Sequence, residues 1–118
     1  MAIFARIHQG LAWLTVAGLA LLFYLAGMGM FGASSFEAHR GVGYLVALLI
    51  LILLVLALIR REPRRLLGLS ALLAVLVIVQ VFLPSLRTSV PLLAALHPVN
   101  AVALLGVNAT ILRSARLP

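Results

Sequence analysis

Long apolar runs limit what this chain can fold into more than any other feature of its sequence. The run GYLVALLILILLVLALI holds 17 residues without a charge, and LLAVLVIVQVFL follows after an arginine-rich break. A helix needs about 20 mainly apolar residues to cross a bilayer. Hydrophobic residues make up 65% of the 118, and the mean hydropathy is +1.28. A water-soluble domain of this size has too little interior to hide that surface. We therefore expect one membrane-integral domain, residues 1–118.

Prolines, glycines and polar clusters divide the chain into four expected spans, at residues 7–30, 35–60, 66–83 and 91–112. Ser34 and Glu37 have the spacing of a capping box at the start of the second span, and Pro63 breaks the helix after its end. Ser89 is expected to cap the fourth span, with Pro91 in its first turn. Short connections predict an all-α, antiparallel four-helix bundle, in which the second and fourth spans lie diagonally opposite.

The basic residues predict the orientation of these spans. All nine are arginines, and seven lie near the termini or between the second and third spans: Arg6, Arg60, Arg61, Arg64, Arg65, Arg113 and Arg116. Arg40 and Arg87 lie in the other two connections. Arginine-rich loops stay in the cytoplasm, so both termini are expected there, in a multi-pass protein of the inner (plasma) membrane. Topology thus accounts for the net charge of +7, and no nucleic-acid partner is expected.

The composition also removes several kinds of chemistry. The sequence has no cysteine, which excludes disulfides, thiolate metal sites and covalent heme attachment through Cys-x-x-Cys-His. Glu37 and Glu62 are its two acidic residues, so general acid–base catalysis has few groups to use. We therefore expect no catalytic residue.

Two histidines are expected at the same depth on the second and fourth spans. His39 lies five residues past Ser34 and His97 eight past Ser89, which is about 7 and 12 Å along the helix axes. On diagonal helices, two such imidazoles could bind one heme b from opposite sides, and bundle cores are where such sites are built. His39 and His97 are therefore the candidate iron ligands. Structural hydrogen bonds between helices are the alternative role for them.

Other residues could line this site. Gly43 and Ala101 each lie four residues beyond a histidine, on the same helix face, where a small side chain leaves room for a porphyrin edge. Close helix packing would equally explain both. Arg40 and Arg87 could pair with heme propionates or reach lipid headgroups.

Three further residues have smaller expected roles. His8 shares no leaflet with the other histidines and is expected at the headgroups beside Arg6. Asn100 or a backbone carbonyl could orient a ligand imidazole through its other nitrogen. Pro98 directly follows His97 and could bend the fourth helix.

The segments FEAHRGVGYL and AALHPVNA resemble the histidine-bearing helices of one four-helix half of a heme A synthase, and also small four-span bacterial membrane proteins with the same stretches. The resemblance implies that His39 and His97 face a heme between their helices. This chain has one half where the family has two, and Glu37 precedes His39 by two residues where the family's glutamate precedes its histidine by three. The resemblance therefore extends to heme binding and not to oxidation of heme O.

Two functions remain open from the sequence. One is a small b-type cytochrome that transfers electrons, with a larger membrane redox complex and a quinone as its candidate partners. The other is a cofactor-free accessory subunit that packs laterally against a larger membrane complex. A transporter is disfavoured, since the spans lack paired helix breaks and a line of polar residues.

Overall fold

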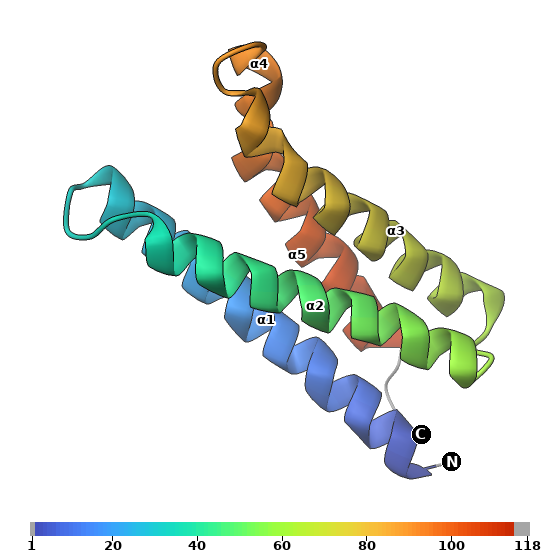
Figure 1. The fold of residues 1–118 in the computed structure, drawn as a ribbon. Helices are drawn as coiled ribbons and strands as arrows, with labels where there is room; N and C mark the ends of the chain where they lie inside the picture. Colours follow the sequence, from blue (N-terminus) through green and yellow to red (C-terminus); the bar gives the residue numbers. More distant parts are fainter. Residues whose placement is uncertain (1, 115–118) are drawn as a thin grey trace.

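The structure, a computed structural model, describes residues 2–114, which are helical apart from short connections (Figure 1). The elements are α1 (Ala2–Met30), α2 (Glu37–Ile59), α3 (Arg64–Phe82), the 3₁₀ turn η1 (Leu83–Leu86), α4 (Pro91–Ala94) and α5 (His97–Ser114). Four stretches are long and apolar enough to cross a membrane: Ile3–Met30, Glu37–Ile59, Arg64–Leu86 and Pro91–Ser114. The expected all-α fold, with four helical stretches of spanning length, is confirmed for this part of the chain. Arg116 lies outside the described residues.

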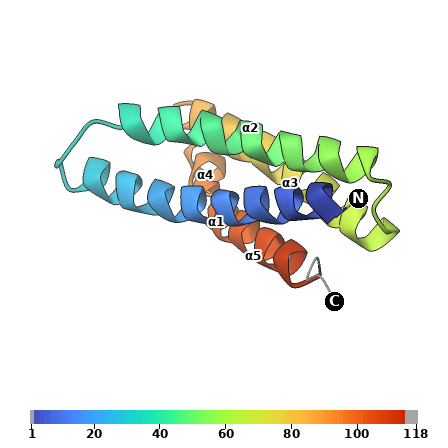
Figure 2. The ribbon, with the colours of Figure 1, turned by 90° about the horizontal axis from the view of Figure 1, so that it is seen from below.

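The four long helices form a ring in which each packs against its neighbours in the chain. α1 packs against α2, α2 against α3, α3 against α5, and α5 against α1 (Figure 2). α2 and α5 therefore lie diagonally across the bundle. The antiparallel arrangement predicted from the short connections is the one observed.

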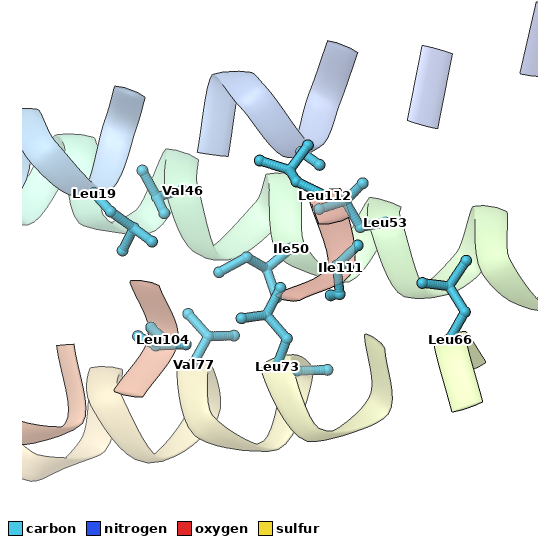
Figure 3. Packing of buried hydrophobic residues seen from close by; sticks show 12 residues of the cluster. Leu19, Val46, Ile50, Leu53, Leu66, Leu73, Val77, Leu104, Ile111 and Leu112 are labelled. Carbon is cyan, nitrogen blue, oxygen red and sulfur yellow. The ribbon is translucent and has the colours of Figure 1, made fainter. Parts of the chain in front are cut away.

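The two helix pairs, α1–α2 and α3–α5, diverge toward one end of the bundle (Figure 1). We call this the open end; it holds the α1–α2 connection, η1 and α4. The closed end holds the start of α1, the end of α5 and the α2–α3 connection. Buried side chains such as Ile50, Leu73 and Ile111 meet away from the open end (Figure 3). By contrast, residues 37–45 and 97–103 include no buried side chain.

A residue with left-handed backbone geometry ends each of the first two helices. Gly32 (φ 73°) ends α1, and Ala33 after it donates its N–H to the Met28 carbonyl at 2.8 Å. Arg61 (φ 51°) has the same place after α2, where the Glu62 N–H bonds a carbonyl of the last turn at 3.1 Å. Both are Schellman motifs, which satisfy the last carbonyls of a helix and favour glycine at the left-handed position.

The two serine caps predicted from the sequence are wrong. The Ser34 hydroxyl donates to the Ser35 carbonyl at 3.2 Å, and the Glu37 N–H donates to the Ser35 hydroxyl at 3.4 Å rather than to Ser34. Phe36 holds the N-cap position of α2 instead, because its ring packs on α1. Ser89 lies outside α4, whose N-cap position is held by Val90 without a side-chain hydrogen bond.

The fourth span is two helices, where the sequence predicted a single one over residues 91–112. α4 ends at Ala94, and α5 begins at His97 with Pro98 as its second residue. A proline disfavours helical geometry in the residue before it and cannot donate a backbone hydrogen bond. Since the first turn of a helix needs no such donor, Pro98 is accommodated by starting a new helix. His97 consequently lies in the first turn of α5.

Candidate functional site

His39 and His97 lie next to each other across the open end of the bundle. Their ring centres are 6.1 Å apart, and their planes are inclined at 61°. His39 lies in the first turn of α2 and His97 in the first turn of α5, and both side chains are half-buried. Two diagonal helices thus bring together the two histidines that the sequence singled out.

A backbone carbonyl of a neighbouring helix orients each imidazole. Nδ1 of His39 lies 3.0 Å from the Leu22 carbonyl oxygen of α1. Nδ1 of His97 lies 3.0 Å from the Gln80 carbonyl oxygen of α3. A carbonyl oxygen only accepts hydrogen bonds, so Nδ1 carries the proton in both rings. Each neutral ring therefore has its lone pair on Nε2, the form in which histidine binds a metal.

Gln80 and Asn100 form a polar network beside His97. The Gln80 side-chain nitrogen, which can only donate, lies 3.3 Å from His97 Nε2. The Asn100 amide nitrogen donates to the Gln80 side-chain oxygen at 2.7 Å and to the Leu76 carbonyl at 2.9 Å. Gln80 therefore contacts both nitrogens of the His97 ring, one through its backbone and one through its side chain. The sequence suggested Asn100 or a carbonyl for this orienting role; the carbonyl fills it.

Phe36 forms a wall of the site that the sequence analysis missed. Its ring lies edge-on to His39, with centres 6.2 Å apart. The other side of the ring packs on Gly29 of α1, where an added Cβ would lie 2.7 Å from ring carbon. Such an approach is possible only at glycine. The sequence did carry a signal for this contact: the first helix ends in a glycine-rich stretch, and an aromatic residue follows three positions before His39.

The remaining predicted site residues belong to α2, α5 and the turn before α4, and the ion pair found within residues 2–114 includes neither Arg40 nor Arg87. Gly43 and Ala101 are half-buried. A Cβ on Gly43 would meet the Leu22 side chain at 3.8 Å, an ordinary contact, so this glycine borders α1. Arg40 and Arg87 are exposed. The ion pair within residues 2–114 joins two other side chains at the closed end.

His8 does not lie at the surface as expected, because α1 begins at Ala2 and places this residue well inside the helix, on a face that is buried in the bundle. Its side chain is 1% exposed, and Nε2 finds no hydrogen-bond partner among residues 2–114. Asn108 of α5 is 0% exposed; its amide nitrogen donates to the Ala12 carbonyl at 2.9 Å, and its oxygen has no partner in the same range.

The donor set at the open end consists of two nitrogens. Residues 2–114 contain no group of three or more His, Cys, Asp or Glu side chains that could hold a bare metal ion. A heme requires fewer protein ligands, since the porphyrin supplies four nitrogens to the iron and the protein supplies the axial positions. Two neutral imidazoles with their lone pairs on Nε2 fit that need, once the Gln80 amide that bonds His97 Nε2 turns away.

Comparison with known proteins places the chain in a family. Residues 23–88 match a family of unknown function, DUF6220. The protein belongs to this family. The matched stretch includes His39, Gly43 and Gln80 and ends before His97. No curated protein matches the chain, and no solved structure does.

Proposed function

We propose that this DUF6220 protein is a small b-type cytochrome of the plasma membrane, with both termini in the cytoplasm. It binds one heme b between α2 and α5, with His39 and His97 as the axial ligands. It passes electrons to a larger membrane redox complex, with a quinone as a possible partner. Bound heme supplies reversible one-electron oxidation and reduction, for which two axial imidazoles are suited.

The observation that carries this proposal is the geometry of the histidine pair. An imidazole nitrogen lies about 2 Å from a bound metal, and the ring centre lies about 1 Å beyond it, so two imidazoles on one iron have centres about 6 Å apart. The observed separation is 6.1 Å. In addition, the Leu22 and Gln80 carbonyls hold the two Nδ1 atoms, which leaves Nε2 of each neutral ring as the nitrogen able to bind iron.

The surroundings support the same function. The divergence of the helix pairs leaves the first turns of α2 and α5 without buried side chains. Gly43 and Ala101 present little bulk one turn beyond each ligand. Arg40 and Arg87 are charged groups on exposed positions near this end, able to pair with propionates. The carbonyls of Leu22 and Gln80 fix the rings and increase their basicity as ligands.

One observation favours the second candidate, a cofactor-free accessory subunit. Gln80 hydrogen-bonds both nitrogens of His97, so this histidine could serve only to join α3 to α5. An apolar groove between α1 and α2, lined by residues including Ala17, Gly18 and Leu49, would suit lateral packing on another membrane helix. In that function the protein takes up no heme.

A visible spectrum of the detergent-purified protein, expressed with sufficient heme and then reduced with dithionite, separates the two functions. The cytochrome predicts a sharp α-band that is lost or turned high-spin in His39→Ala and in His97→Ala. His8→Gln is the matched control, since it removes the third histidine from the other end and should keep the band. A colourless wild-type protein would contradict the cytochrome and favour the accessory subunit.

A further inference from the structure

The connection between α2 and α3 carries the densest charge at the closed end, in the residues Arg60, Arg61, Glu62, Arg64 and Arg65. Arg60 and Glu62 pair with each other, with 2.7 Å between a guanidinium nitrogen and a carboxylate oxygen, and their side chains are 21% and 10% exposed. The other three arginines are exposed, and no carboxylate within residues 2–114 pairs with them. The connection therefore presents three positive charges without a protein partner in that range.

Arg61 has a backbone geometry that favours glycine. Its φ is 51°, in the left-handed region, and Gly32 has the corresponding place after α1 with φ 73°. An arginine in this geometry costs backbone free energy that a glycine does not. Non-glycine residues held in such geometry cluster at functional sites. The backbone thus gives a reason, separate from the charge, to expect a role for the exposed Arg61 side chain.

An apolar stripe runs along α3 directly beyond these arginines. Gly68 and Leu72 follow Arg64 at intervals of four residues, which places all three on one face of the helix. Gly68 is exposed, and a Cβ there would meet no atom within 4 Å. Leu72 and Val75 are 45% and 57% exposed, whereas Leu73, on the opposite face, is buried. The outer face of α3 therefore has a cationic end and an exposed apolar length.

A phospholipid with an anionic headgroup matches both parts of this face. Guanidinium groups donate charge-assisted hydrogen bonds to phosphate oxygens, and arginines next to a spanning helix attract anionic lipid. The acyl chains of the same molecule would cover Leu72 and Val75. A zwitterionic phospholipid offers the same chains without net charge, and inorganic phosphate offers charge without chains. Of the three, the anionic phospholipid alone uses the arginines and the stripe fully.

We propose that Arg61, Arg64 and Arg65 bind the headgroup of an anionic phospholipid whose acyl chains lie along the outer face of α3. Figure 2 shows their connection at the end of the bundle where α1 starts, away from the α1–α2 connection of the open end. In the proposed orientation this end meets the cytoplasmic leaflet, whose surface is negative. Lipid binding requires no heme, and only the choice of leaflet depends on that orientation.

Native mass spectrometry of the full chain in detergent tests the proposal, with phosphatidylglycerol and phosphatidylcholine of identical acyl chains as the two probes. The wild-type protein should bind phosphatidylglycerol about fivefold more tightly or better. Replacement of both Arg64 and Arg65 by glutamine should weaken that binding about fivefold for each arginine and leave phosphatidylcholine binding unchanged. Replacement of both Arg40 and Arg87 by glutamine is the matched control: it removes the same charge from other connections and should change neither affinity.

Three results would overturn the site. One is equal affinity of the wild-type protein for the two lipids. Another is an equal loss in the two double variants, which would show attraction by net charge alone. The third is displacement of phosphatidylglycerol by excess inorganic phosphate, which would make free phosphate the ligand. Where the Arg64 and Arg65 double variant does not fold, Arg61→Gly tests the same headgroup contact: its affinity for phosphatidylglycerol should fall about fivefold, and an unchanged affinity would contradict the proposal.

Discussion

The side-chain nitrogen of Gln80 lies 3.3 Å from Nε2 of His97, the atom that would bind iron. Asn100 holds the other end of the same carboxamide at 2.7 Å. For a metal to reach His97, Gln80 must therefore turn away, while its backbone carbonyl can keep its bond to Nδ1. The same residue thus orients the ring and covers its ligating atom.

Replacement of Gln80 by leucine should speed heme uptake. The variant keeps the carbonyl that orients His97 and loses the amide that covers Nε2, so one hydrogen bond of about 1 kcal/mol no longer has to break. We expect the second-order rate constant for heme association, measured by stopped-flow absorbance on the heme-free protein, to rise about fivefold. Gln9→Leu, at the other glutamine, is the matched control and should leave the rate constant unchanged. An equal or slower rate in Gln80→Leu would show that the amide is no obstacle.

Gly29→Ala should disturb the site from one helix away. A Cβ at Gly29 would lie 2.7 Å from a carbon of the Phe36 ring, so the ring must shift, and with it the edge-on contact to His39. We expect a loss of about 1–3 kcal/mol in stability and an altered ¹⁵N shift for His39 in the heme-free protein. Gly27→Ala, on the same helix, is the control, because a Cβ there would meet no atom within 4 Å. Equal effects of the two alanines would contradict the role given to Phe36.

The two histidines show how much of the candidate site could be predicted from the sequence. His39 and His97 were placed at one depth by counting from Ser34 and Ser89, neither of which caps its helix. The histidines nevertheless lie at the same end of the bundle, because both helices begin later than the sequence suggested. His39 and His97 therefore both lie in the first turn of their helices. Apolar runs, with the prolines, glycines and polar clusters between them, were sufficient to predict four long helices, and the short connections predicted which helices are neighbours.

The sequence could not predict which residues of different helices contact each other. Gln80 is a polar residue in an apolar run, for which the sequence predicts an interhelical hydrogen bond, but that the partner is His97 depends on how α3 is rotated about its axis. His8 was misplaced because the first helix starts five residues before the position that hydropathy suggested. The sequence signal for the end of α4 and the start of α5 is Pro98. A proline at this position is equally compatible with one continuous, kinked helix, so the sequence could not distinguish the two.

Arg61→Gly should stabilise the protein. Arg61 has φ 51° in the position after α2, where an L-residue costs about 1–2 kcal/mol and glycine costs little. We expect the free energy of unfolding to rise by about 1 kcal/mol, measured by thermal unfolding in detergent with circular dichroism. Arg65→Gly removes the same charge from the first turn of α3 and should lower stability, since glycine weakens a helix. A decrease in Arg61→Gly would mean that its side chain contributes more than its backbone costs.

Ile50→Ala should show that the core lies between the helices and not on the lipid-facing surface. Ile50 is 0% exposed and packs with Leu73 and Leu104 in the cluster of Figure 3. Its truncation leaves a cavity between α2, α3 and α5 and should cost about 2–5 kcal/mol. Ile52, two residues along α2, is 38% exposed, and its truncation should cost less because detergent or lipid fills the space. Thermal unfolding of both variants in the same detergent measures the difference. If Ile52→Ala were the more harmful of the two, the rotation of α2 in the bundle would have to be different.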